Sequence, residues 1–90
     1  MNAKEKCDSV YQQCRTLFPT SELSWSKLRE MIETIKDIAR ENNISLYDGD
    51  LERCYKLTWN KSGESGSKRD FEISRDQLRD TALHIQSKLP

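Results

Sequence analysis

The sequence lacks several features that would point to a class of protein at once. Its 15 basic and 15 acidic residues leave no net charge, which argues against a general polyanion-binding surface. No apolar run is longer than two residues, so no segment is expected to cross a membrane. No apolar run follows the polar start of the chain either, and we therefore expect no secretory signal.

Cysteine is present in an odd number, which argues against a disulfide framework. The three residues are Cys7, Cys14 and Cys54, and without a secretory signal they indicate reduced thiols and a cytoplasmic location. Together with His84 they have the composition of a zinc site. Cys7 and Cys14, however, would lie about 10 Å apart along a helix, which is too far for one tetrahedral ion. We expect no metal and no cofactor, and interpret Cys7 and Cys14 as small core residues.

Other common site patterns are also missing. The glycines at 63 and 66 do not follow either of the usual phosphate-binding patterns. The acidic residues Asp48, Asp50 and Glu52 lack the frame of a calcium loop, and the first two are better explained as turn residues. The only histidine, His84, has no nucleophile or carboxylate at a sequence spacing that indicates a catalytic site. The chain is therefore not expected to be an enzyme.

The length and composition indicate one small domain spanning residues 1–90. Hydrophobic residues make up 34% of the chain and charged residues 33%, so the core must be small. A small core and a net charge of zero both favour association, and a homodimer is one form that it would take.

Two helices are expected in the first half of the chain. Apolar residues at helical spacing predict one over 3–18, capped by Asn2 and ended by Pro19. A wider apolar stripe predicts a second over 25–42, with Asn42 and Asn43 as its stop. Its polar face would carry Arg29, Glu33 and Lys36, and Glu33 is expected to pair with Arg29 or with Lys36.

The periodicity then changes to two, which predicts strands at 44–47, 51–60 and 70–74. Asp48-Gly49 has the chemistry of a two-residue hairpin turn, and it would pair Leu46 with Leu51. In the same way, pairing Trp59 with Phe71 keeps the apolar residues on one face. This places Trp59 and Tyr55 in the core. Arg53 falls on the apolar side of its strand and does not fit.

A final helix is expected over 75–89, where Ser74 and Gln77 have the spacing of a capping box. The predicted fold is α+β, in the order α-α-β-β-β-α, with an antiparallel meander of two or three strands packed against the helices. The first strand has the weakest signal. Between the second and third strands, residues 61–69 read as a flexible loop.

Two surface features are candidates for binding. The 61–69 loop carries Lys61, Lys68 and Arg69, and a basic hairpin tip of this kind contacts nucleic acid in some proteins. The final helix carries a row of two arginines beside a row of two aspartates, which would be complementary across a two-fold axis. That candidate interface comprises Arg75, Asp76, Arg79 and Asp80.

The absence of reactive groups favours a small accessory or regulatory protein that acts by protein–protein interaction. Phages, plasmids and bacteria encode many accessory proteins of this general kind, and that analogy holds only at the level of class. The alternative is a nucleic-acid-binding module that uses the basic 61–69 loop. It is the less favoured of the two, because the chain as a whole is neutral.

Overall fold

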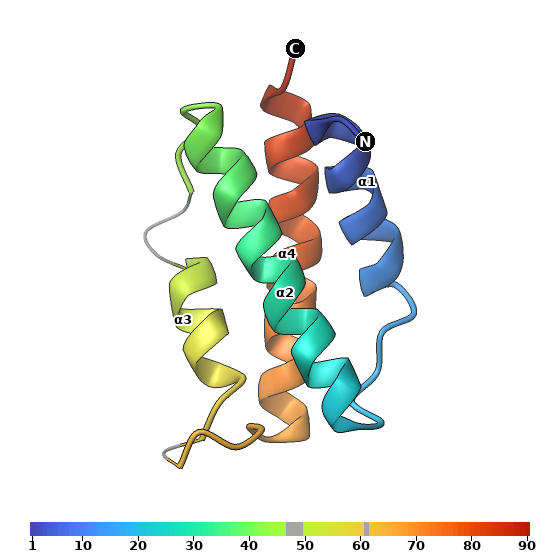
Figure 1. Ribbon diagram of the computed structural model, residues 1–90, viewed down its shortest axis with the longest axis vertical. Helices are drawn as coiled ribbons and strands as arrows, with labels where there is room; N and C mark the ends of the chain where they lie inside the picture. Colours follow the sequence, from blue (N-terminus) through green and yellow to red (C-terminus); the bar gives the residue numbers. More distant parts are fainter. Residues whose placement is uncertain (47–49, 61) are drawn as a thin grey trace.

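Helices form all of the regular structure in the part of the chain that the structure describes. The computed structural model describes residues 1–46, 50–60 and 62–90. In these residues it contains α1 (Ala3–Cys14), α2 (Glu22–Glu41), α3 (Asp50–Leu57) and α4 (Lys68–Lys88). The longest helix, α4, packs against each of the other three (Figure 1).

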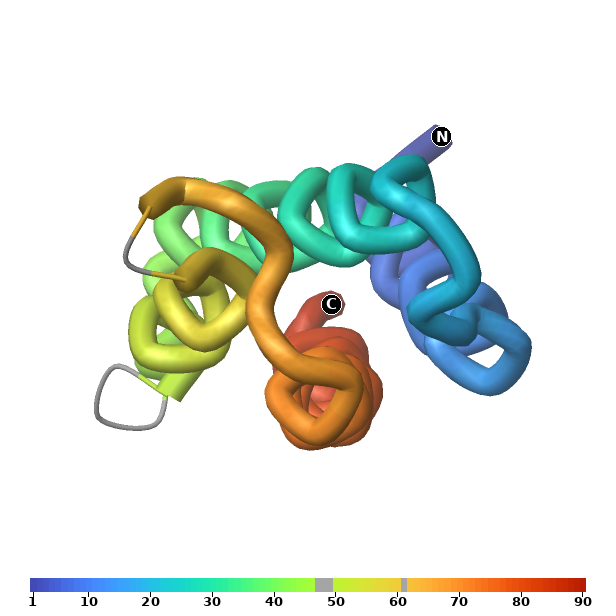
Figure 2. Tube along the Cα trace, turned by 90° about the horizontal axis from the view of Figure 1, so that it is seen from below, coloured from blue at the N-terminus to red at the C-terminus, as the bar shows by residue number. Residues whose placement is uncertain are grey.

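The helices are arranged in two layers. Seen along α4, α3 and α1 lie on its two sides and α2 crosses above them (Figure 2). The molecule is only 17 Å thick along its shortest axis and 39 Å long, which fits two layers of helices. Among the described residues, no helix covers the side of α4 that faces away from α2, so this part of the structure leaves the outer face of α4 open (Figure 2).

The first two helices lie where the apolar periodicity indicates, but their ends differ from those expected. In α1, the Asn2 side chain accepts a hydrogen bond from the backbone N–H of Glu5 at 2.8 Å, which satisfies one free donor of the first turn. The helix ends at Cys14, four residues before the expected end. α2 begins three residues earlier than expected, at Glu22.

The end of α2 is a Schellman motif. Asn43 has a φ of 55°, and its N–H donates to the Arg40 carbonyl. The N–H of Ile44 donates to the Ala39 carbonyl at 2.9 Å, so two otherwise free carbonyls of the last turn are paired. Asparagine tolerates the left-handed conformation that this stop requires.

The expected strand at 51–60 is a helix over most of its length. In α3 the buried residues are Leu51 and Cys54, and Thr58 follows just after it, a spacing of three and four. Arg53, the misfit of the strand pattern, is exposed in the helix. An element of eight residues fits both periods, and burial against the neighbouring helices selects the helical one.

The expected strand at 70–74 is the start of α4, which begins seven residues before the predicted helix. The capping box is formed by Ser67 and Asp70 rather than by Ser74 and Gln77. Ser74 is fully buried, and its hydroxyl donates to the Cys54 carbonyl at 3.1 Å. Phe71 lies in the core edge-to-face with Trp25, with ring centroids 4.9 Å apart, and does not pair with a strand.

The α+β fold with an antiparallel meander is therefore wrong. Residues 44–46 have no regular secondary structure, and the proposed hairpin turn at Asp48-Gly49, with Tyr47, lies outside the described residues. The described residues contain no sheet, only an isolated bridge between Trp59 and Ser65. The core is a layer of side chains between α2 and α4, closed at its sides by α1 and α3. Its largest fully buried members are Leu28, Ile32, Ile35, Leu51, Phe71, Leu78 and Ile85.

Candidate functional site

The connection between α3 and α4 is a tight turn, residues 58–66, and residue 61 is outside its described part. Trp59 and Ser65 face each other in an antiparallel bridge. Inside the turn, the Asn60 side-chain oxygen accepts the backbone N–H groups of Ser62 and Glu64, both at 2.9 Å. The turn is thus held by its own hydrogen bonds, as in other Asx turns.

The 58–66 turn is also attached to two helices. The Gly66 N–H donates to the Thr58 carbonyl at 2.9 Å. A Cβ atom at position 66 would lie 2.3 Å from the carbonyl oxygen of Leu57, so only glycine allows the chain to pass this close to the end of α3. The Ser65 hydroxyl donates to the carboxylate of Glu22, the first residue of α2. These contacts fix the turn at the end of the molecule where α2 and α4 begin (Figure 1).

Trp59 stands on this turn with its ring stacked on a buried arginine. The Arg29 guanidinium carbon lies 3.7 Å from the centroid of the Trp59 ring. Arg29 is only 8% exposed, whereas Trp59 is 38% exposed. Arg29 Nη1 donates to the Thr58 carbonyl at 3.2 Å, and no carboxylate of the described residues lies within ion-pair distance of it. One side of the indole is thus fixed by a cation while part of the ring remains open to solvent.

The sequence pattern predicts other positions for both residues. It predicts Trp59 in the core, on the apolar side of a strand, and Arg29 on the solvent face of the second helix, where Glu33 is one possible partner. Of the two pairings expected for Glu33, the structure contains the one with Lys36, at 3.8 Å, and not the one with Arg29. The stack depends on a contact between residues 30 positions apart, and nothing in the local pattern around Arg29 or Trp59 indicates it.

Of the three basic residues predicted as a binding loop, two lie at the start of a helix and one lies outside the described residues. Lys68 and Arg69 are the first residues of α4, not the tip of a flexible hairpin, and both are exposed. Neither forms an ion pair with another described residue. Lys61 lies outside the described residues. Lys68 and Arg69 follow Gly66 by two and three residues, so their Cα atoms lie within about 11 Å of the Gly66 Cα atom. Gly66 is itself hydrogen-bonded to Thr58, the residue before Trp59.

The predicted interface residues on α4 are close together, and their charges pair within the helix. Asp76 accepts from Arg75 at 3.2 Å and lies 3.7 Å from Arg79. Arg79 is also 3.3 Å from Asp80. Arg75 donates in addition to the Leu17 carbonyl at 3.0 Å, so it fixes the connection between α1 and α2. The four charges sum to zero, and each side chain has an oppositely charged neighbour on α4.

The cysteines are not arranged for reactivity. All three are free and buried, and burial raises the pKa of each thiol, for Cys14 to about 11. Such thiols remain protonated and are poor nucleophiles and ligands. Among the described residues, no cluster of three or more His, Cys, Asp or Glu side chains is suitable for a metal ion.

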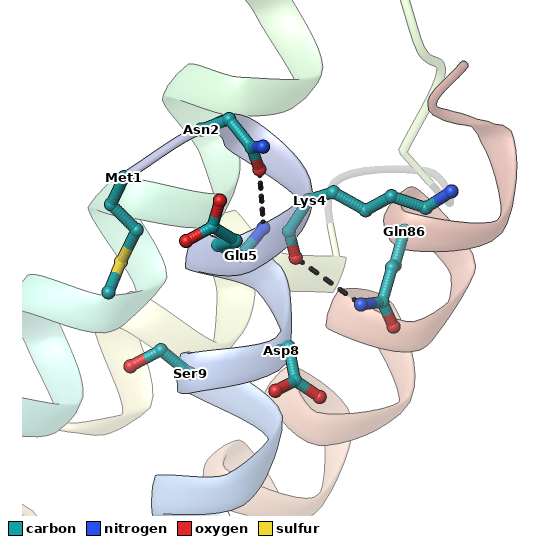
Figure 3. Close-up of a pocket in the computed structure, with 7 residues that line it drawn as sticks. All are labelled: Met1, Asn2, Lys4, Glu5, Asp8, Ser9 and Gln86. Atoms are coloured by element: carbon teal, nitrogen blue, oxygen red, sulfur yellow. Dashed lines mark hydrogen bonds between the residues drawn. The ribbon is translucent and has the colours of Figure 1, made fainter.

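Two shallow grooves flank the helix ends opposite the 58–66 turn. The first, of about 420 Å³, lies between the start of α1 and Gln86 of α4 (Figure 3). The Gln86 side chain donates to the Lys4 carbonyl at 3.3 Å across it, and the carboxylates of Glu5 and Asp8 line its wall. The second, of about 520 Å³, is lined by residues 42–46 of the α2 end with His84 and Lys88. The residues lining the first groove include no nucleophile paired with a base.

Comparison of the chain with family models, with curated proteins and with solved structures gives no match. Within residues 1–46, 50–60 and 62–90, no helix combines the length and the apolar character needed to cross a bilayer. Function therefore has to be argued from the surface of the molecule itself.

Proposed function

We propose that the protein is a small, non-catalytic accessory or regulatory protein that acts by protein–protein interaction through the outer face of α4. The observation that supports this most directly is that two large apolar residues on that face are open to solvent. Ile73 is 39% exposed and Leu83 is 43% exposed, although α4 is the helix that all the others pack against. Apolar side chains in such a position are available to a partner.

The spacing along α4 suits a partner helix. Ile73, Asp76, Asp80 and Leu83 are separated by three, four and three residues, which is the spacing of a coiled-coil seam. The two apolar residues are about 15 Å apart along the helix, at 1.5 Å per residue. A partner helix lying along the outer face would therefore cover both residues and the acidic pair between them.

A second copy of the chain is the first partner to test. The four central charges on α4 cancel, and the chain as a whole has no net charge, so two copies do not repel each other. In a parallel pair related by a two-fold axis, the arginine side of one α4 meets the aspartate side of the other. Because these charges already pair within each helix, they would add little energy, and Ile73 and Leu83 would contribute most.

The proposal includes the cellular compartment in which the protein acts. Three free thiols without a disulfide are compatible with a reducing compartment, and we expect the protein to act in the cytoplasm.

Light scattering coupled to size-exclusion chromatography tests the proposal directly. We expect a dimer at high micromolar concentration, and we expect Leu83→Lys and Ile73→Lys to convert it to a monomer with an unchanged helical circular dichroism spectrum. Leu23→Lys is the matched control, because Leu23 is 81% exposed on α2, away from the outer face of α4. A wild-type protein that stays monomeric throughout this range would remove self-association.

A further inference from the structure

We infer that Trp59, fixed on Arg29, is the stacking platform of a binding site for single-stranded nucleic acid, with Lys68 and Arg69 contacting the backbone. This site is at the turn end of the molecule, and its Arg69 lies one helical turn before Ile73 of the outer face of α4. It differs from the loop suggested by the sequence, because its centre is an aromatic ring and not a cluster of lysines.

The ring is prepared for stacking in a way that a surface tryptophan ordinarily is not. The Arg29 guanidinium covers one side of the indole at 3.7 Å and is itself only 8% exposed, so the ring orientation is fixed before any ligand arrives. The bridge from Trp59 to Ser65 fixes its backbone in the same way. A pre-oriented ring loses little conformational entropy when a base stacks on its open side.

Two positive groups that follow the turn are available to an anion. Lys68 and Arg69 are both exposed, and neither has a carboxylate partner among the described residues. α2 and α4 also both begin at this end, and the first residues of a helix carry partial positive charge (Figure 1). The N-cap residue of α2, Ser21, makes no side-chain capping hydrogen bond, and its carbonyl accepts the N–H of Ser24 at 3.1 Å.

Two carboxylates near the ring limit how many phosphates the site can hold. Glu22 accepts a hydrogen bond from Ser65, and Glu64 lies 3.4 Å from the Asn60 amide. These two carboxylates would repel a phosphate backbone that crosses the turn. The strand is therefore expected to leave Trp59 toward Lys68 and Arg69, with one stacked base and about two phosphate contacts. Binding should depend more on stacking than on charge.

This arrangement makes a quantitative prediction of the salt dependence. Each phosphate contact to a single strand contributes about 0.7 to the slope of log affinity against log salt, so two contacts give a slope of about −1.4. Lys68→Ala should reduce it to about −0.7. Duplex DNA should bind more weakly than a single strand, because its bases are not free to stack on the ring.

The test is a titration with oligo(dT) and oligo(U) of about ten nucleotides, a length within the usual site size of single-strand-binding folds. Binding should quench the fluorescence of Trp59, and Trp59→Phe should abolish the quenching, since the other tryptophan, Trp25, is buried. In fluorescence anisotropy with labelled oligonucleotide, Trp59→Ala should weaken binding about tenfold or more, and Trp59→Phe by less. Lys36→Ala is the control, because Lys36 lies elsewhere on α2 in an ion pair with Glu52.

Circular dichroism and urea unfolding of each variant show whether it has folded, and Lys68→Ala changes only an exposed residue. Absence of binding by the wild type at low salt and high micromolar protein would overturn the inference. So would binding that Trp59→Phe and Lys68→Ala leave unchanged. A preference for oligo(U) over oligo(dT), or the reverse, identifies the natural strand within the same proposal. The dimer test changes Ile73 and Leu83, whereas this test changes Trp59 and Lys68, so the failure of one proposal is distinguished from the failure of the other.

Discussion

Replacing Gly66 by alanine should destabilise the protein more than any other single-methyl addition in the turn. The new Cβ would lie 2.3 Å from the carbonyl oxygen of Leu57, about 1 Å inside a normal contact. That oxygen belongs to the backbone at the end of α3 and cannot rotate away as a side chain would. Either the turn or the end of α3 must shift, at a cost of about 1–3 kcal/mol for an overpacked site.

The shift also weakens the hydrogen bond from the Gly66 N–H to the Thr58 carbonyl, now 2.9 Å long. A backbone hydrogen bond of this kind contributes about 1 kcal/mol, so the total loss for Gly66→Ala is about 2–4 kcal/mol. That is a large share of the roughly 5–13 kcal/mol expected for a chain of this length. Urea unfolding followed by circular dichroism measures it as a lower midpoint with an unchanged slope.

Gly63→Ala is the matched control in the same turn. Gly63 has a φ of +82°, but nothing lies within 4 Å of the position that its Cβ would occupy. The expected cost is only the backbone strain of a left-handed alanine, about 1–2 kcal/mol, and Gly63→Asn should cost less because asparagine tolerates that region. A free energy of unfolding for Gly66→Ala within about 0.5 kcal/mol of the wild type, the spread of neutral surface changes, would contradict the predicted clash. So would a larger loss of stability in Gly63→Ala than in Gly66→Ala.

Three further predictions rest on other contacts. The free energy of unfolding should fall as pH rises from about 9.0 toward about 11, because the Cys14 thiol ionises near 9.0 in the unfolded chain, whereas burial raises its pKa to about 11 in the folded protein. Urea unfolding at several pH values measures this fall, and Cys14→Ala should make it smaller. Lys36→Met should raise the pKa of Glu52 in an NMR titration, since the hydrogen bond and charge of Lys36 now lower it; an unchanged titration of Glu52 would contradict the pairing. A double-mutant cycle with Arg29→Met and Trp59→Leu should give a coupling energy of about 0.5–2 kcal/mol, and additive losses in stability would show that the stack contributes nothing.

The helices of the first half were accessible to sequence reasoning because their signals are long or chemically specific. The apolar stripe of α2 repeats over five turns, and no alternation of period two fits it. Asn2 and Asn43 act at the ends of α1 and α2 as their chemistry suggests. The ends that were misplaced, at Cys14 and Glu22, depend on fraying and local capping, for which several neighbouring residues are equally suitable.

The strands predicted in the second half are wrong because the apolar pattern there fits both the two-residue period of a strand and the period of a helix. From residue 51 to 59 the odd positions are apolar except Arg53, which suggests a strand, whereas Leu51, Cys54 and Thr58 are one face of a helix. Two local facts already disagreed with the strand: Arg53 on the apolar side and Cys54 on the polar side. In the structure α4 begins at a capping box of Ser67 and Asp70, upstream of the Ser74-Gln77 pair that predicts the start of the helix.

Some residues of the candidate sites can be named from the sequence, whereas the contacts that position others appear only in the structure. Sequence alone could name Lys68, Arg69 and the charged residues of α4, because charge is visible without a fold. It could not show that Arg75 fixes the Leu17 carbonyl, or that Arg29 is buried beneath Trp59, since each contact joins distant parts of the chain.

The sequence by itself determined the neutral, strongly charged composition, the small core, the free thiols and the stripe of α2, all of which depend on residue types and local spacing. Only the tertiary structure decided that residues 50–57 are helical and that Trp59 faces solvent. The physical reason is that a short segment has little intrinsic preference, and its conformation follows from which surface it can bury. Here α3 packs against α2 and α4 and buries Leu51 and Cys54 from one helical face, and Trp59 follows the end of the helix and stacks on Arg29.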